Sequence, residues 1–112
     1  MKEVQKVWGK EVWVVNCKEY CGKLLYIDKD AVSSEHYHKQ KQETFCCLQG
    51  HVELLVEGTH YFLEPLNEPV TIMPNQVHSF RGVDNKSVLL EVSTKHSDKD
   101  VFRSTESQKG QE

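Results

Sequence analysis

The segment His36-Tyr37-His38-Lys39-Gln40-Lys41-Gln42-Glu43 contains the residues best suited to chemistry. Side chains alternate between the two faces of a β-strand, so the two histidines lie on the same face. A carboxylate follows after four intervening residues, and a further imidazole comes far downstream. Three imidazoles and one carboxylate suit a borderline divalent ion such as iron, manganese, nickel, cobalt or zinc. The sequence therefore predicts a centre for one such ion, with the ligands His36, His38, Glu43 and His78.

A second segment supplies the last of these ligands. Residues 72–80 are typical of a strand, a tight turn and another strand. Pro74 fixes the backbone angle φ, and Asn75 tolerates the left-handed conformation that a tight turn needs. The turn is expected to aim His78 toward the other three ligands. The remaining histidines lack this spacing, and we interpret them as surface or hydrogen-bonded residues: His51, His60 and His96.

Short apolar or alternating segments recur along the chain and predict an all-β protein. Turn-forming residues separate them, and no stretch has a long helical period. The expected strands cover residues 12–16, 23–27, 33–38, 44–48, 52–56, 60–63, 70–72, 77–80 and 88–92. Many short strands at close spacing are typical of a β-sandwich or a β-barrel. Gln49-Gly50 and Glu57-Gly58 predict two successive hairpins over residues 44–63.

Composition narrows the classes of function. A chain of 112 residues with 38% hydrophobic and 28% charged residues is expected to form one globular domain. The net charge of −3 and the scattered lysines argue against nucleic-acid binding, and no apolar run is long enough to span a membrane. The first residues lack the apolar core of a signal peptide, which predicts a cytoplasmic protein. We therefore expect free thiols rather than disulfides at the four cysteines.

The predicted ligands resemble the motifs of the cupin superfamily. The first cupin motif is His-x-His, four residues, Glu, six residues and Gly, and His36, His38, Glu43 and Gly50 match it. The second motif, Pro-x-Gly-x-x-His with a later Asn, is degenerate here. Its histidine is retained as His78, whereas Met73, Asn75 and Gly82 stand in the places of the proline, the glycine and the asparagine.

The resemblance extends over residues 7–103 and points to small cupins of sugar metabolism. The segments 8–13, 20–23 and 91–96 are similar to the cupin domains of sialic-acid synthases and of mannose-6-phosphate isomerases, as are Asp98, Asp100 and Arg103. The resemblance implies an all-β fold, a small cupin barrel of the jelly-roll (double-stranded β-helix) type. It also implies that the four ligands hold a divalent ion at the mouth of the barrel, with positions left for water or substrate.

Three functions fit such a site. The first is a metal-dependent isomerase or epimerase of a small sugar or sugar phosphate, because a bound ion can polarise a carbonyl group. The second is a non-haem iron dioxygenase, and the third is a module that binds a sugar or nucleotide-sugar without turnover. All three imply a small-molecule partner.

The candidate catalytic residues are Lys23 and Glu91. Lys23 would hold an anionic substrate if it reached the cavity, and Glu91 would act as a general base if it faced inward. The alternative is that both are solvated strand residues. Strand alternation predicts that the cavity is otherwise narrow and apolar, lined by Phe45, Cys47 and Phe80.

The two ends differ from the barrel. Residues 1–10 are predicted to form an arm that adds an edge strand or crosses to a partner, and residues 11–103 the barrel. Residues 104–112 contain nothing to bury and are predicted to form a disordered tail. Small cupins commonly dimerise through a β-face, so the resemblance implies a homodimer.

Overall fold

The computed structural model describes residues 1–110, and its ordered elements are almost all strands. The strands are β1 (Lys2–Lys6), β2 (Gly9–Asn16), β3 (Cys21–Ile27), β4 (His36–Tyr37), β5 (Glu43–Gln49), β6 (Val52–Val56), β7 (Thr59–Leu63), β8 (Val70–Ile72), β9 (His78–Gly82), β10 (Ser87–Ser93) and β11 (Phe102–Arg103). A single turn of 3₁₀-helix, η1 (Asp98–Asp100), precedes the last strand. Within residues 1–110, no helix is long and apolar enough to cross a membrane.

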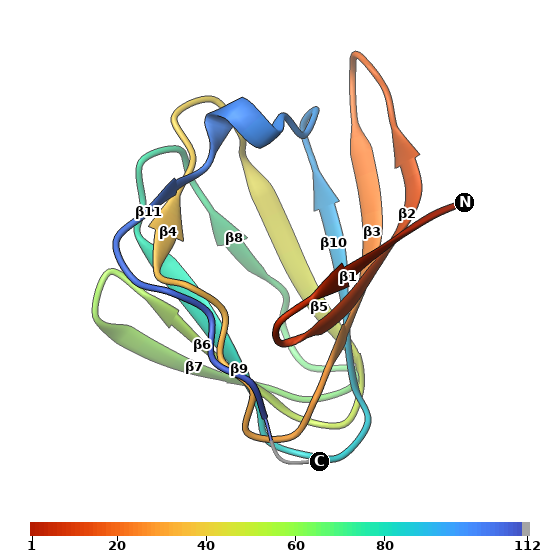
Figure 1. Cartoon of the computed structure of the whole chain (residues 1–112), viewed down its shortest axis with the longest axis vertical. Helices are drawn as coiled ribbons and strands as arrows, with labels where there is room; N and C mark the ends of the chain where they lie inside the picture. The colour runs from red at the N-terminus through yellow and green to blue at the C-terminus, as the bar shows by residue number, and fades with distance from the viewer. Residues whose placement is uncertain (111–112) are drawn as a thin grey trace.

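The strands form two antiparallel sheets that face each other (Figure 1). One sheet has six strands in the order β1-β2-β3-β10-β5-β8, and the other has five in the order β11-β4-β9-β6-β7. Neighbours in a sheet are often far apart in sequence: β10 lies between β3 and β5. The all-β barrel predicted from the strand pattern is confirmed.

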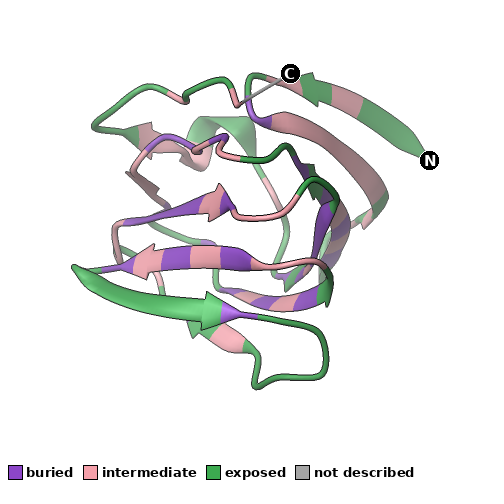
Figure 2. Ribbon diagram, turned by 90° about the horizontal axis from the view of Figure 1, so that it is seen from below, coloured by how far each residue is buried: buried purple, intermediate pink, exposed green. Residues whose placement is uncertain are grey.

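The core lies between the sheets, because each inner strand turns alternate residues inward. In β3, for example, Leu25 and Ile27 are buried while Leu24 and Tyr26 face outward. Figure 2 shows the same alternation of buried and partly exposed residues along the inner strands. The buried apolar cluster includes the three residues that alternation predicted to face inward, Phe45, Cys47 and Phe80. The edge strand β7 is exposed except at its last residue.

Only one of the two expected hairpins forms. Glu57 and Gly58 both have positive φ, 48° and 82°, and join β6 to β7 in one sheet. The turn at Gly50 instead carries the chain from β5 in the six-stranded sheet to β6 in the other. Gly50 lies against the backbone of residues 86–87, where a Cβ atom would come within 2.8 Å of a carbonyl oxygen. Turn residues thus mark where the strand ends but not which strand becomes its neighbour.

Both ends of the described chain pack onto the barrel. The predicted N-terminal arm contributes β1, which pairs with β2 as an edge strand of the same chain. The sequence predicted disorder over residues 104–112. Residues 104–108 instead exchange backbone hydrogen bonds with residues 32–35, including both bonds between Val32 and Gln108. The described part of this segment is held by main-chain pairing, which composition does not reveal. Residues 111–112 lie outside the described chain.

Candidate metal centre and active site

Three strand ends bring the predicted ligands together. His36 lies in β4 and His38 directly after it, while Glu43 begins β5 and His78 begins β9. The pairing of β4 with β9 sets His36 opposite His78. The turn before β9 has the left-handed residue expected from the sequence: Asn75 has φ 71°.

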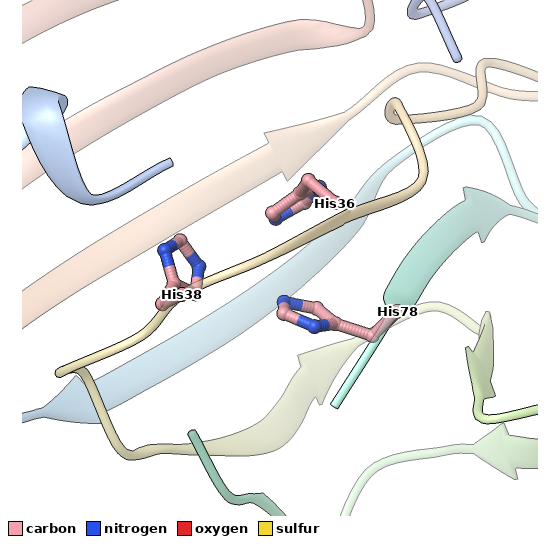
Figure 3. A group of neighbouring side chains, drawn as sticks. All are labelled: His36, His38 and His78. Carbon is pink, nitrogen blue, oxygen red and sulfur yellow. The ribbon is translucent and has the colours of Figure 1, made fainter. Parts of the chain in front are cut away.

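The three imidazoles form one compact group. One nitrogen from each of His36, His38 and His78 lies within 4.8 Å of the other two. Figure 3 shows the rings gathered around a common space, one from the strand that bears His36, one from the loop after it and one from β9. His38 and His78 are buried, and His36 is partly exposed.

Each imidazole is oriented by a backbone carbonyl. The Nδ1 atom of His36 lies 2.7 Å from the oxygen of Ser34, and that of His78 lies 2.9 Å from the oxygen of Gln76. The Nδ1 atom of His38 lies 2.8 Å from the oxygen of Asp100. Because a carbonyl oxygen only accepts, Nδ1 carries the proton in all three rings, and Nε2 keeps its lone pair. Such carbonyl contacts orient histidines that bind metals.

Glu43 completes the set of donors. Its Oε2 atom lies 3.0 Å from Nε2 of His38 and 3.2 Å from Nε2 of His78. Among the buried side-chain atoms of the described chain, Glu43 Oε2 and His78 Nε2 lack a hydrogen-bond partner despite this approach. With the proton on Nδ1, both atoms are acceptors, and a cation between them would satisfy both. The four residues therefore fit a divalent metal ion.

The protonation states of His36 and Glu43 also suit metal binding. Burial, with the neighbouring His78, lowers the pKa of His36 to about 3, so its ring is neutral at pH 7. Burial alone would raise the pKa of Glu43, but the pKa is held well below its usual value, and the charge of Lys41 contributes to this lowering. Neutral imidazoles and a charged carboxylate are the forms that bind metals.

A cavity of about 330 Å³ opens beside the ligands. Its volume is typical of small-molecule sites. His36, His38 and Glu43 form part of its wall. The prediction of an apolar lining is wrong: Phe45 and Phe80 are in the wall but Cys47 is not, and charged side chains line much of the rest. Residues 5–8, around the β1–β2 turn, and parts of the C-terminal segment 101–107 also line it, so both ends of the chain shape the cavity.

Lys23 lies in the cavity wall, although it is only 1% exposed. Its Nζ atom is 3.6 Å from Oε1 of Glu11 and 4.1 Å from the centre of the Trp13 ring. Burial lowers its pKa; the carboxylate of Glu91 acts in the opposite direction, and the charge of Lys41 adds to the lowering. A lysine with a lowered pKa can exchange a proton more readily near neutral pH.

Glu91 also faces the cavity, from β10. It is 4% exposed. Its Oε2 atom accepts a hydrogen bond from the hydroxyl of Ser93 at 3.1 Å and lies 2.7 Å from Nζ of Lys41. Both candidate catalytic residues therefore line the same cavity as the ligands and are not solvated strand residues. Their roles stay predictions.

The sequence analysis did not single out Lys41 as a residue of the site. Lys41 is 3% exposed and lines the cavity. Burial would lower its pKa, but Glu91 and Glu43 outweigh burial and raise it. Lys41 lies in the loop before β5, where strand alternation does not decide the side, and its burial depends on contacts with residues 50 or more positions away.

His96 and Asp100 also take part in the site. His96, predicted to lie outside it, lines the cavity with its Nδ1 atom 3.1 Å from Nζ of Lys41. The Asp100 carboxylate accepts the backbone N–H groups of residues 39–41, and its carbonyl holds His38. These contacts join residues about 60 positions apart, which spacing alone does not predict.

The chain is similar to curated sugar isomerases over most of its length. It is 34% identical to the D-lyxose ketol-isomerase of Thermofilum sp. over 124 aligned positions, which cover 85% of this chain and 68% of that protein. It is 32% identical to the D-lyxose/D-mannose isomerase of Thermosediminibacter oceani over 117 positions, covering 79% of this chain and 64% of that protein. The chain therefore spans about two thirds of the length of these relatives. No family model matches the sequence.

Solved structures identify the fold. KdgF from Halomonas sp. aligns with a TM-score of 0.74 at 18% identity, covering 80% of this chain and 81% of that one. This likeness shows a cupin jelly roll, as the motifs predicted. The sequence relatives go further, because the first is more than 30% identical and is covered over more than two thirds of its length. The chain therefore belongs to the family of the D-lyxose ketol-isomerase, the sugar-isomerase type of cupin.

Proposed function

We propose that this chain is a metal-dependent isomerase that interconverts a small aldose and its ketose. One observation carries the proposal: a single cavity brings the buried Lys23 and Glu91 beside three candidate metal ligands. Isomerisation needs this combination, because a proton moves between neighbouring carbons while a carbonyl oxygen gains charge. Membership of the family supports the same reaction, since the two relatives are named as isomerases of D-lyxose and D-mannose.

One divalent ion per chain would be held by His36, His38, Glu43 and His78. When bound, it would polarise the carbonyl and hydroxyl oxygens of the sugar. Manganese, iron, cobalt, nickel and zinc all accept imidazole and carboxylate ligands, so each is a candidate.

The side chains of the cavity then move the protons. Glu91 takes the proton from carbon 2 of the aldose, and the C–H electron pair forms a double bond to carbon 1. Lys23 donates a proton to the oxygen on carbon 1 as that carbonyl opens. The hydroxyl on carbon 2 then returns a proton to the Lys23 amine, while Glu91 delivers its proton to carbon 1. The product is the ketose, and both residues regain their starting forms.

The lysines of the cavity favour an uncharged sugar. Each lysine of its wall lies near a carboxylate: Lys6 and Lys23 contact Glu11 at 4.0 and 3.6 Å, and Lys41 contacts Glu91 at 2.7 Å. A phosphate would have to compete with these carboxylates for the ammonium groups. We therefore propose free aldoses, with sugar phosphates as weaker substrates.

The proposal predicts carbon-bound hydrogen exchange during turnover. Metal-loaded protein in deuterated water should place deuterium on carbon 1 of the ketose or carbon 2 of the aldose, because the abstracted proton mixes with solvent. The test is NMR on a panel of aldoses with the D-lyxo and D-manno configurations among them, and on their phosphates. Absence of exchange with every sugar and every candidate metal would overturn the isomerase. Oxygen uptake by the iron-loaded protein would point to the dioxygenase instead.

We also propose a homodimer formed through the outer face of the six-stranded sheet. One row of apolar side chains crosses four adjacent strands, and its register pairs Val12 with Leu24, Leu24 with Leu90 and Leu90 with Cys46. Next to this row, Val92 is 53% exposed. Apolar faces of this kind favour burial, and the same face on a second copy is an equally uncharged partner.

The dimer predicts a clear change of mass. The wild-type chain should have twice the 13.0 kDa of a single chain by light scattering, and Val92→Lys should have the single mass, because the lysine places a charge inside the contact. Phe62→Lys is the matched control, since Phe62 is 54% exposed but lies in the other sheet. Equal masses for wild type and Val92→Lys would contradict this interface.

We further propose that the protein acts in the cytoplasm, which its four free cysteines suit.

A further inference from the structure

Lys41 is a buried cation that contacts both a predicted metal ligand, Glu43, and the candidate base, Glu91. Its Nζ atom lies 2.7 Å from Oε2 of Glu91, 3.1 Å from Nδ1 of His96 and 3.9 Å from Oε1 of Glu43. Both carboxylates are almost fully buried, as is the lysine. One ammonium group thus lies between a predicted metal ligand and the predicted base.

Two of these contacts are within hydrogen-bond distance, those with Glu91 and His96, whereas Glu43 lies within ion-pair distance only. A lysine has three N–H donors, so two of the three are engaged. His96 can accept at Nδ1 because its Nε2 atom lies 2.9 Å from the carboxylate of Asp98 and donates to it. Lys41 therefore directs two of its donors to Glu91 and His96, and it acts on the site through these neighbours.

The backbone of Lys41 is held as well as its side chain. Its backbone N–H donates to the carboxylate of Asp100 at 3.1 Å, and Asp100 also receives the N–H groups of residues 39 and 40. The carbonyl of the same Asp100 holds the ring of His38. The loop between the ligands His38 and Glu43 is therefore a rigid frame for the lysine.

The contact with Lys41 also sets which oxygen of Glu91 can react. Lys41 and Ser93 both engage Oε2. Oε1 is thereby the oxygen available to a substrate in the cavity. A carboxylate that lost this contact would be free to rotate, and its negative charge would be uncompensated beside the metal site.

We infer that Lys41 is a positioning residue that holds Glu91 away from the metal ion and aims its free oxygen at the substrate. This inference rests on the proposed function for the role of Glu91. It makes a prediction that a merely structural lysine would not share. Removal of Lys41 should strengthen metal binding, because it removes a positive charge beside Glu43 and frees a second carboxylate. The same removal should slow turnover, because the base is no longer aimed.

The test compares Lys41→Met, Lys41→Arg and the control Lys39→Met. Lys39 is an exposed neighbour whose ammonium lies over the Phe102 ring, outside the cavity wall. Metal dissociation constants come from competition with a chelating dye, and steady-state kinetics give kcat and KM at saturating metal. For Lys41→Met we expect metal binding about tenfold tighter, kcat about 10²-fold lower, and KM changed by less than about threefold. Lys41→Arg should recover most of kcat, since guanidinium keeps the charge.

Two results would overturn the inference. One is a Lys41→Met protein that binds metal more weakly than wild type, which would make the lysine a support for the fold of the ligand loop. The other is an unchanged kcat. If Lys41→Met does not fold, the double variant Lys41→Met/Glu91→Gln also removes the uncompensated negative charge of Glu91. Metal binding by the double variant that is tighter than in wild type would support the inference, and weaker binding would overturn it. A wild type without isomerase activity would end the proposed function, whereas the affinity measurement would still decide whether Lys41 opposes the metal.

Discussion

The His38→Ala variant is expected to lose stoichiometric metal while keeping its fold. His38 supplies one Nε2 atom of the donor set, and a site of three protein ligands holds a borderline ion far less well than one of four. We expect metal affinity to fall by more than about 100-fold, beyond what the loss of a supporting contact causes. Elemental analysis of protein without a histidine tag should give about one ion per chain for wild type and almost none for the variant.

The same variant should not destabilise the metal-free protein. In wild type, Nε2 of His38 faces Oε2 of Glu43 at 3.0 Å, and both are acceptors when Nδ1 binds the carbonyl of Asp100. Alanine removes that conflict, and His38 is not part of the buried apolar cluster. Without metal, the two proteins should therefore melt at similar temperatures. With metal, only the wild type should gain stability, because the ion binds the folded state.

His60→Ala is the matched control for this measurement. His60 is a histidine on the edge strand β7, its side chain is 64% exposed, and its contact is with Glu53 at 3.2 Å. Its metal content should equal that of wild type. A His38→Ala protein that retained one ion per chain would show that the ligand assignment is incorrect, and a His60→Ala protein that lost it would show the same.

The gathering of the three histidines was predictable because two local rules suffice for it. Alternation along a strand places His36 and His38 on one side, and Pro74 with Asn75 predicts the turn that precedes His78. Burial of Phe45 and Phe80 followed from the same alternation. Each of these inferences depends on residues within a few positions of one another.

The missed features depend on long-range pairing. Lys41 has the composition of a loop residue, and its burial follows from the approach of Glu91 and His96, which lie 50 or more positions away. The C-terminal segment contains almost no apolar residues, yet Gln108 pairs with Val32 through main-chain atoms of both residues. Side-chain patterns say little about the main-chain pairing, because nearly every residue carries the same backbone groups. The contacts of Lys41 are made by side chains, but their partners are too far away in sequence for local patterns to identify.

Glu91→Gln should remove most of the isomerase activity without affecting the metal. The amide has nearly the shape of the carboxylate and can still accept from Ser93 and Lys41 through its oxygen, but it cannot take a proton from carbon. General-base catalysis typically contributes 10²–10⁴-fold, so kcat should fall by about 10³-fold with KM little changed. Deuterium incorporation at the sugar carbon should fall in parallel, because both depend on the same proton transfer.

Glu53→Gln is the control for the loss of one carboxylate. Glu53 also lies on a strand, β6, but its side chain is 35% exposed and contacts His60 and Arg81 on the surface. Metal content should match wild type in both variants. If Glu91→Gln kept kcat within about threefold of wild type, Glu91 would not be the base. The assignment would then move to Lys23, whose pKa is lowered by burial and which also lines the cavity.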